Sequence, residues 1–130
     1  MRGPCARSLE LVRAIGTLAS GLGRAGNDTL FGGTGNDKVD GGVGDDKVDG
    51  GVGDDAVSGG AGNDTVSGGT GDDLLVGGRG HDTMFGSSGD DTLLAADGQR
   101  DIVNCGAGQI DKATVDRFDV VSGCESITRR

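Results

Sequence analysis

The sequence predicts an all-β fold: a right-handed parallel β-roll, or β-solenoid, with two parallel sheets built from a nine-residue repeat. The pattern G-G-x-G-x-D-x-U-x, in which U is a large apolar residue, runs six times without a break from Gly32 to Phe85. Looser copies flank it at residues 23–31 and 86–94. Glycine fills 29 of 130 positions and aromatic residues only 2%. An ordinary globular core is therefore excluded.

Each repeat is expected to form a glycine-rich turn followed by a short strand. In the repeat Gly50–Ser58, three glycines allow the backbone to adopt positive φ at low steric cost. The next segment, Ala56–Ser58, has one apolar residue at its centre, and alternation along a strand places Val57 on the opposite side from its neighbours. Two repeats of this kind complete one coil and return the chain above its start.

Side chains 18 positions apart are therefore expected to stack, which gives two facing apolar ladders that form a thin core. One ladder contains Leu30, Val48, Val66 and Met84, and the other contains Val39, Val57, Leu75 and Leu93.

One aspartate per repeat stacks by the same rule. Neighbouring carboxylates about 5 Å apart repel each other, and a divalent cation between them turns that repulsion into cohesion. Ligands that are all oxygen select a hard cation, and a large irregular shell favours Ca²⁺ over Mg²⁺. Pairing each aspartate with the one 18 residues later gives six candidate sites. The two lines are Asp28, Asp46, Asp64 and Asp82, and Asp37, Asp55, Asp73 and Asp91.

Two other interpretations of the repeat involve no metal. One is a disordered Asp-Gly-rich linker, which the regular aliphatic residue argues against, and the other is a stacked coil that needs no calcium. The net charge of −9 and the small apolar core lead us to expect that the roll is loose without Ca²⁺ and stacked with it.

The nonapeptide resembles the RTX (repeats-in-toxin) family of calcium-binding β-rolls, also known from haemolysins, over residues 23–94. The resemblance implies that the first six residues of each repeat form a calcium turn, in which the eight aspartates and turn carbonyls hold the ions. Departures are Arg24 and Ser87, which replace glycines in the flanking copies. The glycines whose carbonyls the resemblance assigns to calcium are Gly33, Gly35, Gly42, Gly44, Gly51, Gly53, Gly60, Gly62, Gly69 and Gly71.

The chain divides into an N-terminal cap or leader remnant at 1–22, the roll at 23–94 and a C-terminal capping tail at 95–130. The apolar spacing in Ser8–Leu22 predicts a helix that covers one end of the roll. A secretory signal fits less well because Glu10 and Arg13 interrupt its apolar region, and a truncated leader is a further interpretation.

The tail contains Cys105 and Cys124, nineteen positions apart. If the coil persists with one inserted residue, they lie about 5 Å apart and can form a disulfide. Two free buried thiols are the alternative, and Cys5 is left over. The tail also resembles those of small actinobacterial-type calcium-binding proteins, which implies export. With a disulfide, we expect a secreted, extracellular protein.

Four apolar residues, Leu74, Val76, Phe85 and Leu94, occupy positions expected to point outward. We expect the tail to pack over them through Phe118, Val120 and Val121, or else a partner to bind there.

No motif predicts catalysis, so we expect a protein that is not an enzyme. The G-x-G-x-x-G match at residues 21–26 follows no strand, and His81 is the only histidine. The acidic charge argues against nucleic acid, and no apolar run is long enough for a transmembrane segment. Two alternative functions remain: a folding or secretion module of a larger RTX hydrolase or toxin, and a surface-binding or adhesin repeat.

Overall fold

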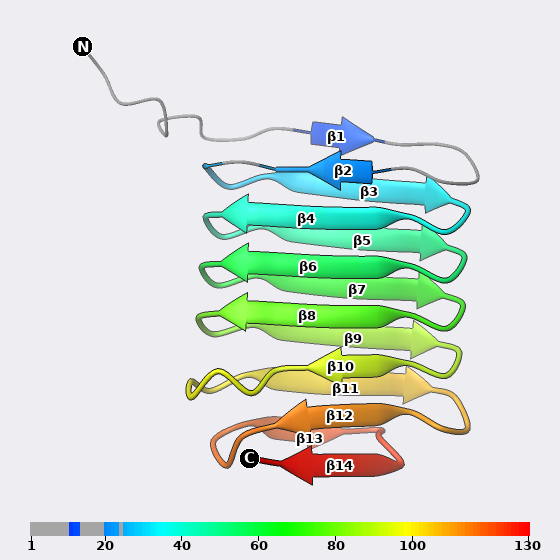
Figure 1. Ribbon diagram of the computed structural model, residues 1–130, viewed down its shortest axis with the longest axis vertical. Helices are drawn as coiled ribbons and strands as arrows, with labels where there is room; N and C mark the ends of the chain where they lie inside the picture. Colours follow the sequence, from blue (N-terminus) through cyan, green and yellow to red (C-terminus); the bar gives the residue numbers. More distant parts are fainter. Residues whose placement is uncertain (1–10, 14–19, 24) are drawn as a thin grey trace.

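The computed structural model describes residues 11–13, 20–23 and 25–130. These residues form a flat roll of two seven-stranded parallel sheets, and the strands of one layer run opposite to those of the other (Figure 1). The first sheet contains β1 (Leu11–Arg13), β3 (Thr29–Thr34), β5 (Lys47–Val52), β7 (Thr65–Thr70), β9 (Thr83–Ser88), β11 (Ile102–Ala107) and β13 (Val120–Ser122). The second contains β2 (Ser20–Leu22), β4 (Lys38–Val43), β6 (Ala56–Ala61), β8 (Leu74–Arg79), β10 (Thr92–Leu94), β12 (Lys112–Val115) and β14 (Ser126–Arg129).

The predicted period of 18 residues sets the strand register. Leu30 pairs with Val48 in the first sheet and Val39 pairs with Val57 in the second. All eight predicted ladder residues are at most 2% exposed, and they form one core cluster between the sheets. The all-β class, the two parallel sheets and the apolar ladders are therefore confirmed.

The turns depend on glycine at two places in each repeat. Gly51 and Gly53 have φ of 106° and 128°, which side chains rarely tolerate. A Cβ atom on either would also collide with the carbonyl group of Gly33 or Gly35 in the previous coil. Ser87, which replaces such a glycine, still has φ of 83°, because it pairs with Gly69 on one side of the sheet and with Gly106 on the other.

The helix expected over Ser8–Leu22 is wrong wherever the structure describes that segment. Leu11 pairs with Thr29 in β3, and Ser20 pairs with Lys38 in β4, so this segment adds strands in the same register. The open edge of a sheet offers unpaired backbone groups, and pairing with them outweighs the helical spacing of the apolar residues. Cys5, and with it most of the expected leader, lies outside the described residues.

The tail extends both sheets beyond the strict repeats, with extra residues accommodated in its turns. Met84 pairs with Val103, and Leu93 pairs with Ala113, so these coils are one and two residues longer than 18. The predicted disulfide between Cys105 and Cys124 is present, with the two Cα atoms 5.1 Å apart. It ties the last coil to the coil before it.

The expectation that the tail covers the outward apolar residues is wrong. Leu74, Phe85 and Leu94 remain 42%, 38% and 37% exposed. Phe85 lies on the first sheet, whereas Leu74, Val76 and Leu94 lie on the second. The four predicted residues therefore do not form one patch. Val120 is itself 46% exposed, because β13 continues the first sheet beside β11 and does not fold over it. Within the described ranges, no helix is long and apolar enough to cross a membrane.

Candidate metal centre

All eight predicted aspartates lie at the same place in the coil, immediately before a strand. Each is at most 3% exposed, although a carboxylate is among the groups least often buried. Asp46, for example, precedes β5, and Asp64 one coil later precedes β7. The two predicted lines of aspartates therefore exist as two columns of buried carboxyl groups, one at each turn of the roll.

Within each column the carboxyl groups are joined to the backbone of the neighbouring coil. In six of the eight aspartates the N–H donates a hydrogen bond to Oδ1 of the aspartate 18 residues later, with N···O distances of 2.7–2.9 Å. These bonds join the six pairs that the sequence predicts: Asp28 with Asp46, Asp37 with Asp55, Asp46 with Asp64, Asp55 with Asp73, Asp64 with Asp82, and Asp73 with Asp91.

The second carboxylate oxygen, Oδ2, differs from Oδ1 in its hydrogen bonding. Oδ2 is buried and has no hydrogen-bond partner in Asp46, Asp55, Asp64, Asp73, Asp82 and Asp91. A buried charged oxygen without a partner is costly, so a repeated set of them is a place where a positive charge would be stabilised.

These oxygens lie against the first glycine of their own repeat. A Cβ atom on Gly50 would lie 2.6 Å from Oδ2 of Asp55 and 2.7 Å from the carbonyl oxygen of Gly68 in the next coil. At Gly59 the corresponding distances are 2.6 Å to Asp64 and 2.7 Å to the carbonyl oxygen of Gly77. A carboxylate oxygen and a carbonyl oxygen thus converge beside Gly41, Gly50 and Gly59, in a space that any side chain would fill.

This donor set fits a hard cation that takes backbone oxygens. Among the described residues, no three histidine, cysteine, aspartate or glutamate side chains gather closely enough to hold an ion by themselves. An ion between coils would therefore take carboxylate oxygens together with carbonyl oxygens, which is the type of shell that Ca²⁺ accepts.

Burial makes the columns electrostatically unfavourable when no cation is present. Desolvation raises the pKa of Asp64 and of Asp73 to about 7, the hydrogen bond from the preceding coil lowers it, and the aspartates above and below raise it further. Desolvation likewise raises the pKa of Asp46, Asp55, Asp82 and Asp91. A cation beside these oxygens would favour the ionised form and oppose the shift.

The predicted glycine ligands, which are the second and third glycines of each repeat, lie in the same turns. Their carbonyl groups, however, contact other atoms than the carbonyl groups of the first glycines do. The carbonyl groups of Gly33 and Gly35 lie against Gly51 and Gly53 of the next coil. The carbonyls that converge with the carboxylate oxygens belong to first-position glycines such as Gly68 and Gly77, which sequence reasoning did not select. Their signal was present, because the first glycine recurs as strictly as the second.

Sequence reasoning also missed two further columns, formed by the residue before each aspartate. At every such position except His81, an asparagine or aspartate Oδ1 accepts a hydrogen bond from the backbone one coil later, as Asn36 does from Asp54 and Asn27 does from Asp45, both at 2.9 Å. Unlike the inner aspartates, these residues are exposed, so they hold the turns in register at the surface of the roll.

A family model described as the RTX calcium-binding nonapeptide repeat (4 copies) matches residues 22–57 and 58–93, which together make up more than half of the chain. No curated protein and no solved structure matches the chain. The matched residues contain all eight predicted aspartates, whereas four further buried aspartates, Asp101, Asp111, Asp116 and Asp119, lie beyond them.

Proposed function

Because the chain belongs to the family of RTX calcium-binding nonapeptide repeats, we propose that it binds calcium ions between successive coils and folds in response to them, outside the cell. Calcium binding follows from the family. The positions of the ions, their coupling to folding and the extracellular setting are the parts that we propose.

The observation that carries the proposal is the buried Oδ2 atom without a hydrogen-bond partner, repeated from Asp46 to Asp91. Beside each lies a first-position glycine with no side chain, and next to Asp46, Asp55, Asp64 and Asp91 a carbonyl oxygen of the next coil approaches the same space. Mg²⁺ requires near-ideal octahedral geometry and gives up its waters reluctantly, whereas Ca²⁺ accepts an irregular shell of protein oxygens. The cradle therefore favours calcium.

Coupling to folding follows from the composition of the core. The two ladders supply few apolar side chains, and the coil brings buried carboxylates into columns in a chain of net charge −9. Repulsion in those columns opposes stacking until a cation neutralises it, and because the cradle exists only in the stacked coil, the free energy of binding becomes free energy of folding.

The extracellular setting is supported by two observations. Proteins with RTX repeats are typically secreted, and the Cys105–Cys124 disulfide is of a kind that persists in oxidising compartments. Repeat domains of this family are generally structural and not catalytic, so we propose no enzymatic activity. Detection of the oxidised protein in the culture medium would support this setting, and its confinement to the reducing cytosol would contradict it.

Two adjacent carboxylates provide a matched test of the proposed sites. Asp55 faces inward and has an unpartnered Oδ2, whereas Asp54 faces solvent, and each accepts one hydrogen bond from a neighbouring coil through Oδ1. Asp55→Asn and Asp54→Asn remove the same charge and keep that acceptor. In calorimetric titrations, Asp55→Asn should weaken calcium binding more than about tenfold, and Asp54→Asn should change it little. Equal effects of both variants would mean that net charge, and not the inner column, attracts calcium.

A further inference from the structure

The inner columns continue past the residues that the family model matches. The N–H of Asp91 donates a hydrogen bond of 2.8 Å to Oδ1 of Asp111, although the two are 20 residues apart. Asp111 is 0% exposed, and its Oδ2 is buried without a hydrogen-bond partner. The pair Asp91 and Asp111 therefore has the same arrangement as the six pairs inside the repeats.

The turn before Asp111 is built differently, because Cys105 stands where the repeats have their first glycine. The carbonyl of Cys105 lies against Gly86, as the carbonyl of Gly68 lies against Gly50. In the repeats an aspartate follows that glycine by five residues, as Asp73 follows Gly68, whereas Asp111 follows Cys105 by six. The turn is thus one residue longer than in the repeats, and the Cys105 carbonyl still lies beside Gly86 together with Oδ2 of Asp91.

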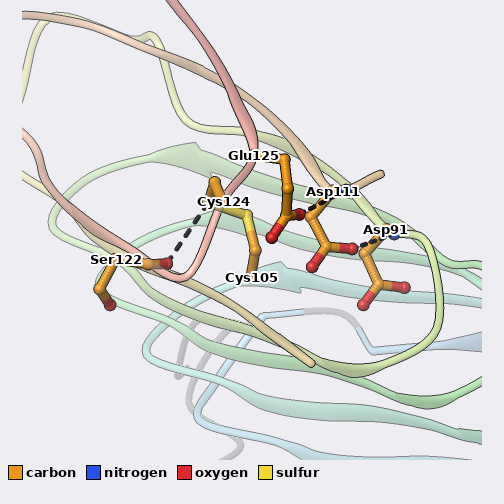
Figure 2. The surroundings of a disulfide bond; sticks show 6 residues. All are labelled: Asp91, Cys105, Asp111, Ser122, Cys124 and Glu125. Atoms are coloured by element: carbon orange, nitrogen blue, oxygen red, sulfur yellow. Dashed lines mark hydrogen bonds between the residues drawn. A yellow bond between two sulfur atoms is a disulfide. The ribbon is translucent and has the colours of Figure 1, made fainter. Parts of the chain in front are cut away.

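The next coil supplies the last carboxylate of this column. Oε2 of Glu125 accepts a hydrogen bond of 2.9 Å from the N–H of Asp111, which is the part that an aspartate plays in every earlier coil. Glu125 directly follows Cys124, and Cys124 is bonded to Cys105. Figure 2 shows Glu125, Asp111 and Asp91 in a row, with the disulfide beside them.

The disulfide therefore lies beside two successive steps of this column. Cys105 contributes the backbone carbonyl that approaches Gly86 beside Oδ2 of Asp91, and Cys124 directly precedes the glutamate that accepts from Asp111 one coil later. Glu125 is exposed, and the neighbouring strands β13 and β14 contain only three and four residues. Without the covalent bond, ordering this last coil would cost more conformational entropy.

We propose that Asp91 and Asp111 hold a further calcium ion beyond the matched repeats, and that the Cys105–Cys124 disulfide sets the affinity of this site by positioning Glu125. The inference rests on the proposed function, because it assigns the same cation to the same type of cradle. It adds a redox dependence that the inner sites lack, since no cysteine lies in their turns.

The site is tested by counting bound ions in the oxidised full-length chain by equilibrium dialysis. Asp111→Asn should bind about one calcium ion fewer than the wild type. Asp90→Asn is the matched control, because it removes the same charge from an exposed carboxylate and keeps the Oδ1 atom that accepts from Gln109 and Ile110. If Asp111→Asn binds as many ions as the wild type, the site does not exist. If the wild type binds no calcium, the proposed function itself fails.

The coupling is tested by the same count after reduction, with Cys5→Ser as background so that no other disulfide forms. Reduction, or Cys124→Ser, should remove or weaken the binding of about one ion and leave the remainder unchanged. An identical count and affinity in both redox states would overturn the coupling.

The positioning role of Glu125 is tested separately, in the oxidised chain. Glu125→Ala should weaken the terminal site by about tenfold or more, and Glu125→Gln, which keeps an acceptor oxygen, should restore most of that loss. Equal binding by the alanine and glutamine variants would contradict the role, because a general loss of stability would not depend on the acceptor oxygen.

Discussion

The backbone N–H of Asp64 donates a hydrogen bond of 2.9 Å to Oδ1 of Asp82, one coil later, while Oδ2 of Asp82 remains buried without a partner. One oxygen of each carboxyl group thus joins two coils, and the other is turned into the space beside the first glycine of its repeat. This division suits an acidic repeat that stacks: hydrogen bonds join successive coils in register, and in the proposed function a cation balances the charge.

Filling one cradle should weaken calcium binding without a change in charge. In Gly59→Ala, the new Cβ would lie 2.6 Å from Oδ2 of Asp64 and 2.7 Å from the carbonyl oxygen of Gly77. Because overpacking costs about 1–3 kcal/mol, we expect a lower melting temperature in saturating calcium and a weaker calcium affinity. Ser58→Ala, at the preceding position, should leave both unchanged. Normal calcium binding by Gly59→Ala would place the ions elsewhere.

The two faces of one strand should differ sharply in their contribution to stability. Leu75 is 0% exposed in the core cluster, whereas its neighbour Leu74 is 42% exposed. In calcium, Leu75→Ala should lower the free energy of unfolding by about 2–5 kcal/mol, and Leu74→Ala by about 0.5 kcal/mol. Chemical denaturation of both variants measures these values. Similar losses would argue against the assigned faces.

The stability of the calcium-free chain should depend on pH in the opposite direction to that of most proteins. Burial raises the pKa of Asp64, Asp73 and Asp101 from 3.8 to about 7. A carboxyl group whose pKa is raised on folding favours the stacked coil fully below pH 3.8, and this contribution is lost as the pH rises through about 7. In chelator, the β content measured by circular dichroism should therefore fall as the pH rises from 4 to 8.

Calcium should reverse that dependence, because it binds the ionised carboxylates. Calcium affinity, measured by titration at several pH values, should weaken as the pH falls below about 7, and binding should release protons. An affinity independent of pH between 5 and 8 would exclude these carboxyl groups as ligands.

The disulfide should stabilise the end of the roll most. Cys105 and Cys124 enclose a separation of 19 residues, for which a disulfide contributes about 3 kcal/mol. After reduction, hydrogen exchange should accelerate at the amides of β13 and β14, such as Ser126, whose N–H bonds the carbonyl of Asp111. The amides of β5 to β7 should keep their protection. Uniform loss of protection along the whole roll would show that the coils unfold as one unit.

The repeated part of the fold could be predicted from sequence because every repeat has the same nine-residue pattern. An apolar residue such as Val57 and an aspartate such as Asp55 recur at one spacing, so the strand register between one pair of coils gives the register of all the repeated coils. The same spacing predicted the disulfide. Asn104, which precedes Cys105, pairs with Ser122, and one residue separates Ser122 from Cys124.

The N-terminal strands and the last carboxyl groups of the columns could not be predicted, because no repeat fixes them. The apolar residues of Ser8–Leu22 have helical spacing, yet residues 11–13 and 20–22 pair as strands with the open edges of the two sheets. Sequence reasoning did not select Asp111 as a ligand, because the extra residue before it breaks the nine-residue count. It did not select Glu125, because the last coil is shorter, with Ala113 paired to Ile127. Such contacts depend on tertiary closure and leave no local pattern.

The central claim is that calcium folds this chain, and a calcium titration followed by far-ultraviolet circular dichroism tests it most directly, with magnesium as control. We predict a transition from coil to β structure that saturates at about micromolar to millimolar calcium and does not occur with magnesium. A spectrum already rich in β structure in chelator at pH 8, and unchanged by calcium, would contradict the claim.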